Sequence, residues 1–103
     1  MKSNMAYILM RVKTPASGVT KQGEIFAQGK LPKLPDFVKR THTFVYVDEG
    51  INSFSLFEVP DDKLFEGMKA VNQRCTGYFT IPGITFKVNP LMEAKDALAL
   101  VGM

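Results

Sequence analysis

The chain has 103 residues, of which 46% are hydrophobic and 22% charged, with a formal net charge of +3. These values predict one folded domain over residues 1–103 and exclude a disordered chain. No apolar run approaches the ~18 residues of a bilayer-spanning helix, so we expect no membrane segment. The basic residues are scattered and show no stacking motif, so we expect no nucleic-acid partner.

The densest basic group is interrupted by two Leu-Pro steps and is typical of a solvated loop, with contact to a polyanion as the alternative; it comprises Lys30, Lys33, Lys39 and Arg40. The first 13 residues lack the long apolar core and small-residue cleavage site of a signal peptide. A single cysteine, Cys75, cannot form an internal disulfide. We therefore expect a cytoplasmic protein.

Residues 5–13 are predicted to form the first strand, because apolar residues alternate there with mixed ones. Thr14-Pro15 should end it, since proline lacks the donor of a central strand. Ser17 to Lys30 is predicted as a short helix capped by Ser17, with Val19, Ile25 and Phe26 facing inward. Three glycines oppose this helix at a cost of about 1 kcal/mol each in its interior. Leu31 to Pro35 should be extended, because residues before proline avoid the helical region.

Thr41 to Val47 and Ile51 to Val59 are dense in β-branched and aromatic residues, and the turn chemistry of Asp48-Glu49-Gly50 separates them. This pattern predicts a β-hairpin. Two registers remain open. A two-residue loop at Glu49-Gly50 would set Phe44 opposite Ser55, whereas a bulge closed by a left-handed Gly50 would place Phe44 and Tyr46 with Phe54 and Leu56.

Two further helices and a fourth strand follow. Asp61 is predicted to cap a helix that ends at Gly77, with an apolar stripe formed by Leu64, Phe65, Met68, Val71 and Cys75. Ile84 to Val88 alternates as a strand. Asn89-Pro90 is then predicted to start a terminal helix, whose apolar stripe comprises Leu91, Ala94, Leu98 and Val101.

This order of elements predicts an α+β domain of the ferredoxin-like βαββαβ plan, an antiparallel sheet with helices on one face, followed by a C-terminal helix. Large side chains on the strands occur on both faces, so that neither face suits water; they are Tyr7, Leu9, Phe44, Tyr46 and Phe57. We expect a second copy of the chain to cover the face without helices, giving a homodimer.

The hairpin with its acidic helix start, THTFVYVDEGINSFSLFEVPDDKLFEGM, and the later ITFKVNPLMEAKDAL resemble the dimeric α/β-barrel superfamily. Within it they are similar to a small bacterial domain family without an assigned activity. The resemblance covers roughly Leu34 to Leu98 and implies two sheets packed face to face around a lumen. Relatives bind small organic molecules or haem there, and some are cofactor-independent monooxygenases or isomerases.

His42, the only histidine, is the candidate catalytic residue, because its pKa suits proton transfer near neutral pH. The alternative is a polar residue at a strand end, and no orienting partner is evident from spacing. Glu58 is a second acid–base candidate. Asp61 and Asp62 indicate a helix start rather than a metal pair, so we expect no metal site, and we expect no cofactor. Cys75 lies on an apolar stripe and is expected to be a buried, unreactive thiol.

Side chains that would offer contacts to an anionic or carbonyl-bearing ligand in a lumen are Tyr7, Arg11, Phe44, Tyr46 and Lys87. Their alternative role is that of the polar halves of amphipathic strands. The function expected from these residues is binding of a small organic ligand between the sheet and a partner subunit. The alternatives are a cofactor-independent monooxygenase or isomerase that uses His42, and a structural or protein-interaction module.

Overall fold

Four strands form one antiparallel sheet in a computed structural model that describes residues 4–103. The expectation for the N-terminus that rests on residues 1–3 lies outside the described residues. The strands are β1 (Met5–Pro15), β2 (Lys39–Val47), β3 (Gly50–Pro60) and β4 (Thr85–Leu91). Their order is β2-β3-β1-β4, and each neighbouring pair is antiparallel. The predicted α+β class and antiparallel sheet are confirmed.

β1 lies inside the sheet and sets the two faces. Ile8 on β1 is opposite Phe57 on β3 and Pro90 on β4. Because successive strand residues point to opposite faces, Ile8 and Val12 share a face with Phe57 and Val59, and all four are buried. We call this the helix face, because the main core lies between it and the helices.

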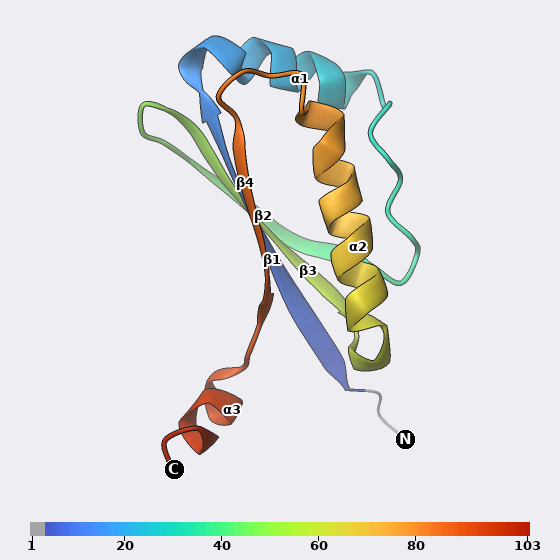
Figure 1. The fold of residues 1–103 in the computed structure, drawn as a ribbon, viewed down its shortest axis with the longest axis vertical. Helices are drawn as coiled ribbons and strands as arrows, with labels where there is room; N and C mark the ends of the chain where they lie inside the picture. The colour runs from blue at the N-terminus through green and yellow to red at the C-terminus, as the bar shows by residue number, and fades with distance from the viewer. Residues whose placement is uncertain (1–3) are drawn as a thin grey trace.

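Two helices pack on the helix face: α1 (Val19–Ala27) and α2 (Leu64–Cys75). Figure 1 shows α2 running alongside the sheet. One buried cluster lies beneath α2 and comprises Ile8, Val38, Phe57, Val59 and Val71. A second closes the other end and comprises Leu31, Tyr78 and Ile81. Together these clusters hold the sheet and helices as two layers.

α1 is shorter than predicted. A 3-10 turn at Ala16–Gly18 precedes it, and no side-chain hydrogen bond caps the turn or the helix, so the predicted Ser17 cap is wrong. Ile25 packs against the second cluster as expected, but Phe26 is 54% exposed. The Thr14 hydroxyl donates to Gln22 Oε1 at 2.6 Å and ties α1 to β1. α1 therefore depends on packing at one end rather than on a buried stripe.

The apolar stripe predicted for α2 packs toward the core except at Phe65. The two ends of the helix also differ from the prediction. Asp61–Lys63 form a 3-10 turn with no side-chain cap, so Asp61 is not the helix cap. Phe65 is 71% exposed and faces away from the core. Gly77 does not end the helical segment, because Thr76–Tyr78 continue as a 3-10 turn.

The C-terminal segment differs most from the prediction. Asn89 and Pro90 lie within β4, opposite Leu9 and Ile8, rather than starting a helix. The terminal helix α3 (Ala94–Ala99) begins later and contains no buried residue, so its predicted apolar stripe is not packed. Figure 1 shows α3 beyond the end of the sheet, apart from α1 and α2. No helix within residues 4–103 is both long and apolar enough to cross a bilayer.

The β2–β3 hairpin adopts one of the two predicted registers. Phe44 is opposite Phe54 and Tyr46 is opposite Asn52, as in the bulged alternative. The turn itself differs, because Glu49 takes the left-handed conformation with φ 55°, while Gly50 has φ 137°. Any Cβ at Gly50 would lie 2.2 Å from the carbonyl oxygen of Thr14, so glycine is required there. The register places Phe44, Tyr46 and Phe54 on one face, opposite to that of Phe57.

Candidate functional site

The face of the sheet opposite the helices is covered by neither α1 nor α2, and we call it the open face. Strand alternation and pairing assign the following residues in the central part of each strand to it. They are Tyr7, Leu9, Arg11 and Lys13 on β1; Lys39, His42, Phe44 and Tyr46 on β2; Asn52, Phe54, Leu56 and Glu58 on β3; and Thr85, Lys87, Asn89 and Leu91 on β4. All six predicted catalytic and ligand-binding residues therefore lie on one face. Phe57, in contrast, lies in the core.

One part of the open face is apolar. A shallow hollow of about 390 Å³ is lined by Leu9, Phe44, Val45, Tyr46, Phe54 and Leu56. Phe44 is 65% exposed and Tyr46 is 46% exposed. The rings of Tyr46 and Phe54 lie 5.6 Å apart between centroids. This arrangement offers aromatic faces and aliphatic groups to a ligand or to a partner surface.

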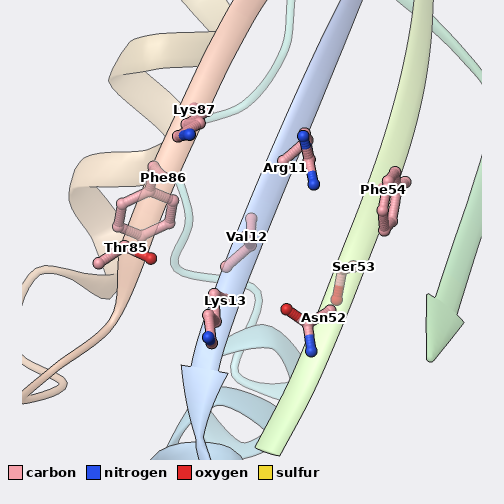
Figure 2. Close-up of a pocket in the computed structure, with 9 residues that line it drawn as sticks. All are labelled: Arg11, Val12, Lys13, Asn52, Ser53, Phe54, Thr85, Phe86 and Lys87. Carbon is pink, nitrogen blue, oxygen red and sulfur yellow. The ribbon is translucent and has the colours of Figure 1, made fainter. Parts of the chain in front are cut away.

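The neighbouring part of the open face is cationic. A hollow of about 140 Å³ crosses β4, β1 and β3, and Figure 2 shows the residues that line it. Arg11 and Lys87 lie directly opposite each other in it, and Lys13 is opposite both Asn52 and Thr85. None of the nine residues that line this hollow is acidic. The hollow therefore presents positive charge and neutral hydrogen-bonding groups.

Arg11 joins the two parts. Its guanidinium carbon lies 5.0 Å from the centroid of the Phe54 ring, and Phe54 lines both hollows. A cation over an aromatic face is attracted by the ring quadrupole. The Phe54 ring thus holds the charge of Arg11 at the boundary of the apolar hollow.

His42 lies at the edge of the apolar part, on β2. Its ring stacks on Phe44 with centroids 5.7 Å apart, and its Nδ1 lies 3.1 Å from the Thr41 hydroxyl oxygen. No carboxylate pairs with His42 within the described residues. A general base is normally held by an orienting acceptor, and a threonine hydroxyl is the nearest group of that kind here. His42 shares the face of Phe44 and Tyr46, as strand alternation predicts, because the register shift between Arg40 and His42 lies before it.

Tyr7 stands apart from the other predicted binding residues. It lies opposite Glu58 and Leu91 and lines a different hollow, near the start of α3, which also contains Asp61, Glu93 and Asp96. The structure therefore brings Arg11 and Lys87 together, and Phe44 and Tyr46 together, but not Tyr7. Sequence reasoning missed Lys13, Asn52 and Thr85. Lys13 lies two residues after Arg11 in the same strand, so its side chain is expected on the same face, and this spacing could have identified it.

Cys75 lies on the helix face, away from the open face. It is buried, and its thiol donates a weak hydrogen bond to Met10 Sδ at 3.5 Å. Burial raises the pKa of Cys75 to about 11, although the nearby charge of Arg74 opposes the shift. A thiol with so high a pKa is a poor nucleophile near neutral pH.

Acidic, cysteine and histidine side chains are not grouped in threes that would hold a metal anywhere in residues 4–103. Comparison of the chain with protein-family models, curated protein sequences and solved structures finds no match. The function is therefore argued from the site itself.

Proposed function

We propose that the protein is a homodimeric α/β barrel of ferredoxin-like subunits that binds a small organic ligand in a lumen between two open faces. The order strand, helix, two strands, helix, strand supports the ferredoxin-like plan. The strand order β2-β3-β1-β4 with antiparallel neighbours is consistent with it. We also propose a cytoplasmic location, because the single Cys75 is a free thiol.

One observation carries the proposal: the open face combines exposed aromatic side chains with an apolar hollow. Phe44 and Tyr46 project from β2, and every residue of β2 is exposed. Large contiguous apolar patches are unusual on monomers and mark interaction or ligand sites. A second copy that places its own open face against the first would cover both patches at once through a two-fold contact.

The chemistry of the two hollows supports one class of ligand. The apolar hollow suits an aromatic or aliphatic body, and the Arg11–Lys87 region suits an anionic or carbonyl-bearing end. Lysine and arginine donate charge-assisted hydrogen bonds to carboxylates. A ligand that spans the Phe54 boundary would satisfy both regions. Asn52 and Thr85 would add neutral contacts beside the charged end.

The first experiment measures the mass of the particle by light scattering over a protein dilution series, with native mass spectrometry for retained ligands. We expect a dimer. Phe44→Ser should raise the dimer dissociation constant by about tenfold or more, since buried aromatic anchors commonly contribute about 2 kcal/mol or more to an interface. Phe65→Ser is the matched control, because Phe65 is similarly exposed but lies on α2. A monomer at every concentration would contradict the dimer, as would equal effects of the two substitutions.

A second candidate function is a cofactor-independent monooxygenase or isomerase. The observation in its favour is that the His42 ring stacks on Phe44 beside the apolar hollow. His42→Ala separates the two candidates once a retained ligand is known. If the parent protein shows no turnover and His42→Ala binds the ligand with unchanged affinity, binding alone is supported. If the parent turns the ligand over and His42→Ala loses this turnover while keeping its affinity, the enzyme is supported. A dimer without a retained ligand would favour a protein-interaction module.

A further inference from the structure

A second cluster of cationic side chains lies on the helix face, on the other side of the sheet from the proposed lumen. Arg40 is near the start of β2, Arg74 is in the last turn of α2, and Tyr78 is in the 3-10 turn that follows. All three line a small hollow of about 30 Å³, whose other walls are Met10, Val12, Phe26, Cys75 and Phe86. The walls between the polar groups are therefore apolar or, at Cys75, a neutral thiol.

The charges in this hollow are not balanced. No aspartate or glutamate lines it, and the one ion pair found within residues 4–103 is between Lys95 and Glu93, at the other end of the molecule. Burial lowers the pKa of Arg40, and the positive charge of Arg74 lowers it further. The two guanidinium groups thus repel each other, although Arg40 is exposed and Arg74 half-buried, so that water screens part of the repulsion. An anion bound between them would offset the remainder.

The hydrogen bonds of these groups leave donors free for a ligand. Arg74 Nη1 donates to the carbonyl oxygen of Pro32 at 3.0 Å, which uses one of the five N–H groups of a guanidinium. Arg40 lies over the ring of Phe57, with its guanidinium carbon 5.8 Å from the centroid. Position at a helix C-terminus explains why a cation such as Arg74 is favourable. It does not explain the second guanidinium beside it.

Tyr78 adds a third donor. The residue is only 9% exposed, yet no hydrogen bond joins its hydroxyl to a protein group in the described part of the chain. No buried side-chain oxygen or nitrogen described in the structure lacks a partner, so the hydroxyl oxygen must be accessible to solvent, and Tyr78 lines the hollow. Buried tyrosine hydroxyls usually find a partner. A ligand oxygen would supply it.

We propose that Arg40, Arg74 and Tyr78 bind the phosphate group of a small phosphorylated ligand. A phosphate monoester carries about −1.5 to −2 charges at pH 7 and three strong acceptor oxygens, which matches two guanidinium charges and three donor groups. Arginine is favoured for phosphate because its planar fork donates two parallel hydrogen bonds. The hollow is too small to enclose a whole ligand, so the phosphate would lie at its mouth and the remainder of the ligand at the surface. This site does not depend on the dimer or on the open face.

The test uses inorganic phosphate as the probe, titrated by calorimetry and by thermal unfolding, with sodium chloride holding the ionic strength constant. We expect saturable heat and a rise in the unfolding temperature. Arg40→Gln should weaken phosphate binding by about tenfold or more, because a hydrogen bond to a charged group is lost. Without phosphate, this variant should unfold no earlier than the parent at low salt, because the repulsion from Arg74 is removed.

Two further variants keep the proposal falsifiable. Lys39→Gln removes a charge from the neighbouring residue, which lies on the open face, and should leave phosphate binding unchanged. Tyr78→Phe keeps the buried ring and removes only the hydroxyl, so it tests the site even if Arg40→Gln folds poorly, and it should weaken binding severalfold. Absence of saturable binding to the parent protein, or equal binding by Tyr78→Phe, overturns the proposal. Tighter binding of acetate than of phosphate at equal ionic strength overturns the assigned phosphate class.

Discussion

Arg11 on β1 and Lys87 on β4 lie directly opposite each other across two paired strands. Like charges in this position destabilise a sheet, whereas opposite charges stabilise it. Phe54 offsets part of the cost by accepting the guanidinium of Arg11 over its ring. An anionic ligand end between the two side chains would relieve the remaining repulsion.

Lys87→Glu should therefore stabilise the ligand-free protein. The substitution converts a repulsive pair into an attractive one, and we expect the free energy of unfolding to rise by about 0.2–1 kcal/mol at low salt. Urea unfolding at low and high salt measures this, and the gain should shrink as salt screens the pair. Lys33→Glu makes the same charge change in the loop before β2. If both variants gain equally, net charge and not the Arg11 pair is responsible.

Gly67 and Gly23 should respond in opposite directions to alanine. A Cβ on Gly67 would lie 3.0 Å from Val59 Cγ1 and 3.3 Å from Ile8 Cδ1, and both neighbours are fully buried. Overpacking there should cost roughly 1–3 kcal/mol, and because both neighbours are buried we expect this cost to exceed the gain of about 1 kcal/mol in helix propensity that alanine brings to α2. A Cβ on Gly23 meets nothing within 4 Å, so alanine should gain about 1 kcal/mol from helix propensity. Chemical denaturation of both variants measures the two changes, and a stabilised Gly67→Ala would show that the α2 contact is loose.

Glu49→Asn should stabilise the hairpin. Glu49 adopts φ 55°, a region that costs a side chain with an ordinary Cβ about 1–2 kcal/mol and that asparagine tolerates better. We expect the free energy of unfolding to rise by up to about 1 kcal/mol. Glu49→Gln keeps the backbone preference of glutamate and removes only its charge. A gain of the same size in Glu49→Gln would assign the effect to charge.

Cys75 should make the protein less stable as the pH rises from about 9 to about 11. The folded state keeps the thiol protonated because burial raises the pKa from the ordinary 9.0 to about 11. Above pH 9 the unfolded chain releases this proton and the folded chain does not, so unfolding becomes more favourable. Tyr78, whose pKa burial also raises, acts in the same direction.

Cys75→Ala isolates the cysteine's share of this pH dependence. The alanine variant loses packing at every pH, which lowers its free energy of unfolding throughout. The difference in this free energy between variant and parent should narrow between about pH 9 and about pH 11, where the folded and unfolded parent differ in bound protons. Urea unfolding across that range measures it. A difference that stays constant would mean that the thiol ionises equally well in the folded state.

The sequence predicted the hairpin, β1 and the middle of α2 because apolar residues recur in each at the spacing typical of a strand or of a helix. It did not predict the end of β4. Asn89-Pro90 is a good local helix start, but pairing with β1 extends the strand through both residues. Proline is tolerated because β4 is an edge strand, where one side needs no donor. Local propensity was overridden by a long-range pairing that no short window contains.

For the candidate site, the sequence could predict only which side chains share a face of the sheet. Strand parity alone places Arg11 and Lys87 on the same side of the sheet, but their direct opposition depends on the register between β1 and β4. For the hairpin, two registers were open, and the one adopted is defined by the pairing of Phe44 with Phe54. The Arg40–Arg74 cluster had no sequence signal, because these residues are 34 positions apart and meet only when the start of β2 lies beside the end of α2.

Because β2 is paired on one side only, its part of the open face should unfold locally more often than the part on β1. β1 is held by a neighbour on each side, whereas β2 is paired only with β3 and buries none of its residues. Local opening begins where few apolar contacts hold a segment, so β2 leaves the sheet before β1 or β3 does, and its amide protons exchange first. His42, Phe44 and Tyr46 leave with it, while Arg11, on the doubly paired β1, stays in place. A bound molecule would therefore be released from its apolar end first, with its charged end still held.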